Sequence, residues 1–125
     1  MSLPDLNNTK NIDEFIYSFY KSIFSDDFLS PIFNKRIKNN LQEHLNSVSL
    51  YWQKILLGDK RYTNNIIKIH NELNLETPLN DEHYRRWHIH FKETAQGSYS
   101  GIYTDKAIQI SCKIITNMSN ILPLK

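Results

Sequence analysis

Residues that break helices are scarce in this chain of 125 residues. It has only three glycines and four prolines, and they stand where helices would be expected to end, as Gly58 and Pro123 do. A fold built from hairpins needs many more turn residues of these two kinds. The sequence therefore predicts an all-α protein.

The length is that of one compact domain, residues 1–125, which can bury roughly two thirds of its unfolded surface in a single core. Residues 1–10 are expected to form a flexible N-terminal extension. The net charge of +2 is small, and the basic residues are dispersed apart from two clusters, at 35–38 and 85–86, which we interpret as solvated faces. We therefore expect no nucleic-acid partner.

The single cysteine, Cys112, excludes an intrachain disulfide and any cysteine-rich metal site, which agrees with a reducing compartment. The N-terminal sequence MSLPDLNNTK has no apolar signal core, and no segment approaches the roughly 18 apolar residues of a membrane helix. We expect a soluble, cytoplasmic protein that does not enter a membrane.

Apolar residues recur at helical spacing in four segments. Asn11, with Glu14 three residues later, resembles the start of the first helix, and Gly58 is expected to end the second. Asn80 or Asp81 is expected to cap the third. The expected helices cover about 11–25, 41–57, 81–95 and 105–122, with a turn containing Pro31 and an apolar plug of Ile32 and Phe33 after the first.

The segment 61–75 places a histidine between two of these helices. Its apolar run before His70, IIKI at 66–69, is too short for an ordinary amphipathic helix and is expected to form one or two helical turns. From such an element a neutral imidazole can direct a ring nitrogen into an apolar space and bind a metal. The alternative, a hydrogen-bonded histidine in or near the core, stays open on these residues alone.

Three further side chains with polar groups fall on expected buried faces. Tyr20 lies on the inward face of the first helix, and His44 lies on the apolar stripe of the second. Trp87 is the centre of the stripe of the third. A buried phenol must find a partner, which is either another functional group or a backbone carbonyl. Phe33 is either ordinary core or a contact for a flat ligand, and the last helix is expected to supply only core.

The five histidines do not predict a zinc site. His83 and His90 share a helix face, and His88 and His90 form an H-x-H pair, but no cysteine or HExxH pattern supports them. On a helix His88 and His90 point in nearly opposite directions, so both cannot bind one ion.

The order and spacing of several motifs resemble those of group III truncated haemoglobins. The resemblance implies a truncated globin fold, in which two helices pack over two with haem b between them. It covers about residues 12–95. The motifs are Phe19-Tyr20, LSPIF at 29–33, Glu43-His44, Tyr51-Trp52 followed by LLG at 56–58, Tyr62 eight residues before His70, and Tyr84 to Phe91 around Trp87.

The resemblance implies a role for each candidate site residue. His70 matches the proximal histidine that binds the haem iron. The distal polar positions, which stabilise a bound gas, are matched by Tyr20, His44 and Trp87. Contacts with the porphyrin are implied for Phe33, Val48, Trp52, Tyr62, Ile66, Ile69, Leu75, Tyr84 and Phe91. Candidate partners for the haem propionates are Arg61, Tyr62 and Lys68.

The segment before His70 departs from the family pattern. Where the family usually has a glycine and a proline, this chain has Asn64 and Ile66, and the usual apolar residue after the histidine is Asn71. The turn that leads to the short helix is therefore expected to have a different shape.

The implied function is tight binding of oxygen or another diatomic ligand such as nitric oxide. Two donors in a dry pocket would slow oxygen release by about one to four powers of ten. Slow release suits redox chemistry, as a nitric oxide dioxygenase or a peroxidase-like enzyme, with electrons from an unknown external reductase. His44 is expected to donate to the ligand, to act as an acid on peroxide or to bind iron itself. The alternative is a haem-free helical module that binds a partner through residues near 35–38.

Overall fold

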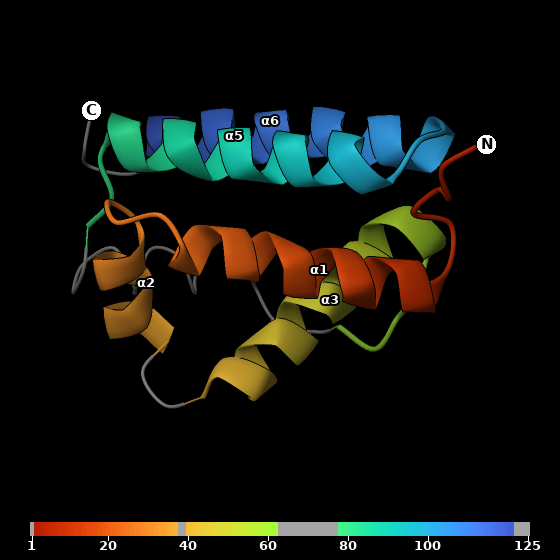
Figure 1. Cartoon of the computed structure of the whole chain (residues 1–125), viewed down its shortest axis with the longest axis horizontal. Helices are drawn as coiled ribbons and strands as arrows, with labels where there is room; N and C mark the ends of the chain where they lie inside the picture. The colour runs from red at the N-terminus through yellow and green to blue at the C-terminus, as the bar shows by residue number, and fades with distance from the viewer. Residues whose placement is uncertain (1, 38–39, 63–77, 122–125) are drawn as a thin grey trace.

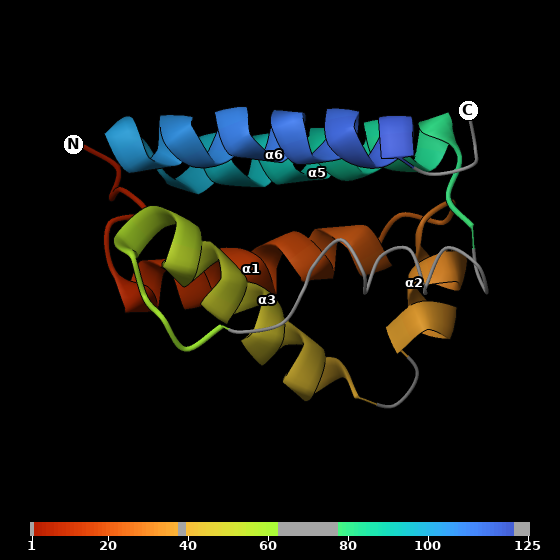
Figure 2. The same cartoon turned by 180° about the vertical axis from the view of Figure 1, so that it is seen from behind.

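The computed structural model describes residues 2–37, 40–62 and 78–121. All regular elements within these ranges are helices, as expected: α1 (Thr9–Phe24), α2 (Ser30–Ile37), α3 (Leu41–Leu57), α5 (Asp81–Ser98) and α6 (Ile102–Ile121). They form two layers, with α5 beside α6 in one and α1 crossing α3 in the other (Figures 1 and 2). Helix α1 packs against both α3 and α5 and so joins the layers. The predicted all-helical, two-over-two arrangement is confirmed.

Helix α3 ends and helix α5 begins where the local sequence predicts. Gly58 follows α3 with a φ of 77°, a left-handed conformation that glycine adopts without a steric penalty. At the start of α5 the side chain of Asn80 accepts the backbone N–H of His83, and the His83 ring accepts the N–H of Asn80 in return. These reciprocal bonds satisfy two donors that the first helical turn leaves unpaired.

The predicted start of the first helix at Asn11 is wrong. Helix α1 begins at Thr9, and its cap is Asn8, whose side chain accepts the N–H of Asn11 at 2.9 Å. The Asn11 side chain instead donates to the carbonyl of Asp5 at 2.8 Å. A cap three residues earlier therefore lengthens α1 by almost a turn and leaves Asn11 to hold the preceding segment.

The last helix begins at Ile102, three residues before its predicted start. Its N-terminal donors are satisfied from a distant part of the chain. The Asp5 carboxylate accepts the backbone N–H groups of Tyr103 and Thr104 and the hydroxyl of Thr104. A carboxylate at a helix N-terminus is also favoured by the helix dipole, so Asp5 stabilises the first turn of α6 in two ways.

The segment around Asp5 is packed on the fold, although residues 1–10 were expected to form a flexible extension. Leu6 is fully buried. Gly101 has a φ of 134°, and a Cβ there would lie 2.5 Å from the Asp5 carboxyl group. Because glycine at 101 has no Cβ, the Asp5 carboxylate can approach the N-terminus of α6 closely.

Residues expected to form a turn with an apolar plug begin helix α2. Pro31 occupies its first turn, where a missing N–H breaks no hydrogen bond. Since α2 is helical, Phe33, Arg36 and Ile37 share one face, and both apolar residues of the three are buried. This face points toward the interior of the molecule.

An aromatic core joins α1 to α3 and α5. Phe15, Phe19 and Phe91 are no more than 1% exposed. The ring centroid of Phe91 lies 4.9 Å from that of Phe15 and 5.3 Å from that of Phe19. Trp52 of α3 approaches the same ring at 5.0 Å. Such contacts contribute about 0.5–1.5 kcal/mol each beyond the area they bury, so this cluster fixes three helices relative to one another.

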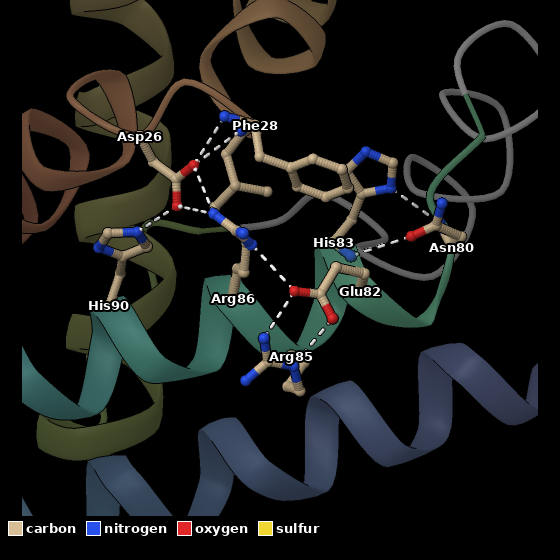
Figure 3. A network of polar contacts seen from close by, with 9 residues as sticks. Asp26, Phe28, Asn80, Glu82, His83, Arg85, Arg86 and His90 are labelled. Carbon is tan, nitrogen blue, oxygen red and sulfur yellow. Dashed lines mark hydrogen bonds and ion pairs between the residues drawn. The ribbon is translucent and has the colours of Figure 1, made fainter.

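Asp26 ties the turn between α1 and α2 to helix α5 (Figure 3). Within the turn its carboxylate accepts the backbone N–H groups of Phe28 and Leu29. From α5 it accepts the Nε2–H of His90 at 2.8 Å and the guanidinium of Arg86 at 3.2 Å. Burial raises the pKa of this carboxyl, but the hydrogen bonds and the charge of Arg86 outweigh it and lower the pKa of Asp26 to about 2.

We expect Asp26→Asn to remove a pH-dependent part of the stability. The pKa of Asp26 in the fold, about 2, lies below the ordinary aspartate value of 3.8, so the carboxylate stabilises the fold above the higher value and loses this contribution as the pH falls through the lower one. Between about pH 5 and pH 2 the free energy of unfolding should fall by about 1–2 kcal/mol more in the wild type than in the variant, as measured by urea denaturation. Asp27→Asn, at an exposed neighbouring position, is the control. Equal slopes in the wild type and Asp26→Asn would contradict this role.

Candidate functional site

A cavity of about 330 Å³ lies between the two helical layers. Its volume is within the usual range for sites that bind small molecules and cofactors, roughly 300–1,000 Å³. Most of its wall is aromatic or aliphatic, which favours an apolar ligand. The lining residues are Tyr20 of α1; Phe33, Arg36 and Ile37 of α2; His44, Ser47, Val48, Tyr51 and Trp52 of α3; Tyr62 and Leu79 outside the helices; Tyr84 and Trp87 of α5; and Ile114, Ile115 and Met118 of α6.

Tyr20 and His44 form a polar pair on this wall. The phenol oxygen of Tyr20 lies 2.9 Å from Nε2 of His44, so α1 and α3 share a hydrogen bond at the cavity. Tyr20 is only 6% exposed, and burial raises the pKa of its phenol well above the usual range. The phenol therefore stays protonated and keeps its ability to donate.

Trp87 faces the same cavity from the other helical layer. Its indole meets Phe19 edge-on at a centroid distance of 5.2 Å and stacks on Phe91 at 5.4 Å. Phe19 also contacts the ring of Tyr20 at 5.2 Å. One core ring thus supports both the phenol and the indole, and each of these carries an N–H or O–H donor.

The structure brings most of the described candidates to one place. Eight of the predicted site residues line the cavity: Tyr20, Phe33, His44, Val48, Trp52, Tyr62, Tyr84 and Trp87. Phe91, for which a porphyrin contact was expected, is not part of the lining. It is fully buried in the layer behind Trp52 and Trp87, where it supports the two indoles.

Several predictions lie outside the described residues. They concern the proximal ligand, His70, three apolar pocket residues, one propionate candidate and the departures from the family pattern. These residues are Asn64, Ile66, Lys68, Ile69, His70, Asn71 and Leu75.

Arg36 is a lining residue that sequence reasoning missed. It was grouped with the solvated basic cluster at 35–38, yet it lies on the cavity wall and is half-buried. Burial lowers the pKa of its guanidinium, and the phenol of Tyr84 partly opposes this. The signal was present in the sequence, because Arg36 lies three residues after Phe33 and shares its helical face.

Helix α6 also contributes more than core. Ile114, Ile115 and Met118 line the cavity, although this helix was expected to supply only core. Apolar side chains that pack against a cofactor and those that pack against a core show the same helical periodicity, so their sequence pattern does not separate the two roles.

Arg61, a predicted propionate partner, is engaged elsewhere. Its guanidinium donates to Asp59 at 2.7 Å and to Gln53 at 2.7 Å. Arg61 is not among the lining residues of the cavity, whereas the neighbouring candidate Tyr62 is. Of the two described candidates, only Tyr62 thus reaches the cavity.

Two of the three histidines of α5 have other partners. His83 belongs to the capping box of α5, and His90 bonds Asp26. In the described part of the chain no three histidine, cysteine, aspartate or glutamate side chains are grouped so as to hold a metal ion. Within the same ranges, no helix has the length and apolar character that crossing a bilayer requires.

The chain is similar to a known globin over nearly its whole length. No model of a protein family matches the sequence. It is 26% identical over 118 residues to the "Group 3 truncated hemoglobin ctb" of Campylobacter jejuni, an alignment that covers 92% of this chain and 91% of that protein. The structure resembles the crystal structure of group III truncated hemoglobin from Campylobacter jejuni with a TM-score of 0.86 and 26% identity, over 98% of this chain and 95% of the other. Sequence and structure thus agree with the resemblance carried by the motifs.

Because burial raises the pKa of Tyr20, we expect its phenol not to ionise in moderate alkali. In an ultraviolet titration of tyrosinate up to about pH 11, the wild type and Tyr20→Phe should gain the same absorbance. The same comparison in concentrated urea, where the fold is lost and the phenol is exposed, provides the control, since Tyr20→Phe should then lack the absorbance of one tyrosinate. A comparable loss in folded Tyr20→Phe would show that the phenol is not shielded as described.

Proposed function

The chain is a truncated globin of the group III type, and from this premise we propose that it holds haem b in the cavity between its helical layers and binds oxygen or another diatomic ligand there. The observation that carries the proposal is the cavity. Its wall is largely apolar, and Tyr20, His44 and Trp87 bring polar groups to it from three helices.

The lining residues suit a porphyrin. A flat apolar cofactor needs aromatic and branched aliphatic neighbours that exclude water. Phe33 and Trp52 supply rings, and Val48 and Ile115 supply aliphatic contacts, from three different helices. Haem would therefore be held mainly by burial of apolar surface between the layers.

We assign the iron ligand to His70, an assignment that rests on its place in the motif pattern. Bound haem supplies an iron that takes up a diatomic gas and shifts negative charge onto it. The protein's part is then to present hydrogen-bond donors to that charge in a space from which water is excluded. Tyr20 and Trp87 carry such donors at the cavity.

Each of these donors would stabilise a negatively polarised ligand by about one to three kcal/mol. Such bonds are lost when the ligand leaves, so they slow its release. Tyr20 is the stronger candidate because a phenol O–H is a stronger hydrogen-bond donor than an indole N–H. The expected result is tight binding with slow release, which suits capture or redox chemistry better than delivery of oxygen.

His44 controls how the phenol of Tyr20 is used. When Nε2 of His44 carries the proton, the ring donates to the phenol oxygen, and the phenol proton is free to point into the cavity. When the proton is on the other nitrogen, Nε2 accepts the phenol proton instead. The tautomer of His44 thus sets whether Tyr20 can donate to a ligand.

Nitric oxide detoxification is the activity we propose to test first, and peroxide chemistry the second. Conversion of nitric oxide and oxygen to nitrate consumes one electron per turnover, which a separate reductase would supply. Slow oxygen release favours this reaction, because the oxygen is still held when nitric oxide arrives. We also propose a cytoplasmic location, where a reductase and the reduced form of the exposed Cys112 would be found.

The protein mixed with hemin should show a strong Soret absorption band, and His70→Ala should lose or greatly weaken that band because the iron loses its protein ligand. His83→Gln is the matched control, since His83 caps α5 and does not line the cavity. Optical spectra of the ferric, ferrous and oxygenated forms provide the measurement. A protein that stays folded and colourless with hemin would favour the haem-free helical module instead.

Tyr20→Phe should release oxygen faster than the wild type, by about tenfold to a hundredfold, because one hydrogen bond to the ligand is removed. The rate is measured by stopped-flow displacement of oxygen from the ferrous protein. Tyr17→Phe, at an exposed position on the same helix, should leave the rate unchanged. An unchanged rate in Tyr20→Phe would refute the role assigned to this phenol.

A further inference from the structure

A serine, a histidine and an aspartate are joined by hydrogen bonds between α1 and α5. The hydroxyl oxygen of Ser22 lies 2.5 Å from Nδ1 of His90. Nε2 of the same ring lies 2.8 Å from a carboxylate oxygen of Asp26, as Figure 3 shows. None of the three residues lines the cavity of the proposed haem site, so they form a second group of polar side chains.

Packed helices hold these three side chains in place. Ser22 lies near the end of α1 and Asp26 follows four positions later, so both can meet one side chain from α5. Phe91, the neighbour of His90, packs on Phe19 of α1 at a centroid distance of 5.3 Å. Side chains carried by such packed elements keep their relative geometry better than side chains on loops.

Asp26 selects the tautomer of His90. The carboxylate is ionised near neutral pH, since the pKa of Asp26 is about 2, and an ionised carboxylate can only accept hydrogen bonds. Nε2 of His90 therefore carries a proton, and in the neutral ring Nδ1 faces the Ser22 hydroxyl as an acceptor. This nitrogen can take the proton of the serine, and the carboxylate stabilises the imidazolium that results.

The hydroxyl of Ser22 differs from that of a nearby serine. Ser25, just after α1, donates to the backbone carbonyl of Lys21 at 3.0 Å, which is a common partner for a hydroxyl one helical turn later. A carbonyl oxygen is too weak a base to take up the proton, whereas an imidazole nitrogen can do so. Ser22 is also partly exposed, so a small reagent can reach it from solvent.

We propose that Ser22 is a nucleophile, with His90 as its general base and Asp26 as the positioning residue, and that it accepts acyl groups from small activated esters. The serine oxygen forms a bond to the carbonyl carbon while its proton passes to Nδ1 of His90. The bond from this carbon to the leaving oxygen then breaks, and the leaving oxygen takes the electron pair and the proton. Water attacks the acyl-serine in the same way, which releases the carboxylic acid and restores Ser22.

The position of Ser22 defines the class of substrate. Because Ser22 lies outside the cavity and is reached from the surface, it selects an ester by reactivity more than by shape. Esters with acidic leaving groups, such as aryl esters, are the most reactive class, since the leaving oxygen departs easily. This activity goes beyond the proposed function and uses none of the residues assigned to the haem site.

The first test is labelling of the hemin-loaded protein by an alkyl fluorophosphonate, which bonds to nucleophilic serines and releases fluoride. The tryptic peptide 22–35 contains both Ser22 and Ser25, and fragment-ion mass spectrometry locates the label. A general base accelerates such a reaction about a hundredfold or more, so Ser22 should be labelled about 100-fold faster than Ser25. Equal labelling of the two serines, or no label on Ser22, would overturn the proposal.

The second test removes the base and keeps the nucleophile. His90→Gln should lower the labelling rate of Ser22 about 100-fold, because an amide forms hydrogen bonds but cannot take up the proton. Asp26→Asn should lower it about tenfold or more, because the ring is no longer held in the required tautomer. His83→Gln, in the capping box of α5, should leave the rate unchanged. An unchanged rate in His90→Gln would show that Ser22 is not activated by this ring.

The third test is cleavage of p-nitrophenyl acetate, followed as acid release at constant pH. Ser22→Ala should cleave the ester about tenfold more slowly than the wild type, and Ser25→Ala should match the wild type. Equal rates in the wild type and Ser22→Ala would overturn ester cleavage at this serine. If a variant lacks the wild-type helical circular dichroism, the ratio of Ser22 to Ser25 labelling in the wild type decides.

Discussion

The packing of Phe19 against Phe91 is the interaction on which the site depends. It locks α1 to α5 with ring centroids 5.3 Å apart. Tyr20 follows Phe19 by one residue, so fixing Phe19 in the core turns the phenol toward the cavity. Trp87 precedes Phe91 by four residues and stacks on it, so the same contact fixes the indole. Phe91, expected to touch the porphyrin, instead determines where the cavity wall lies.

The polar groups outside the cavity keep the ends of the helices in register. Asp26 holds the turn between α1 and α2 to α5 through His90 and Arg86, and Asp5 holds the start of α6 through Thr104. Both carboxylates accept several donors, which compensates for their loss of hydration. These bonds hold the helix ends in place. The fold therefore does not depend on polar contacts across the cavity, and the cavity can be lined mainly by apolar groups.

The sequence predicts those features of the fold and the site that depend on interactions between residues close together in the chain. Gly58 and Asn80 act within a few residues of the helix ends they define, and both predictions are confirmed. The start of α6 depends on Asp5, which is 99 positions away from its partner and leaves no local pattern. Arg36 was assigned to a solvated basic cluster because of its charge. The residues before it were predicted to form a turn, so its position on the same helical face as Phe33 was not recognised. The assignment of the iron ligand remains a prediction from motif spacing.

The bond between Asp5 and Thr104 has a consequence for how the molecule assembles. The ribosome releases α1, α2 and α3 first, but the carboxylate that caps α6 must wait until 99 further residues have been made. Closing so long a loop is entropically costly and slow compared with forming a helical turn. The Asp5 carboxylate is therefore among the last of these groups to acquire its contacts with α6, and this part of the fold is completed where the segment before α1 meets the start of α6.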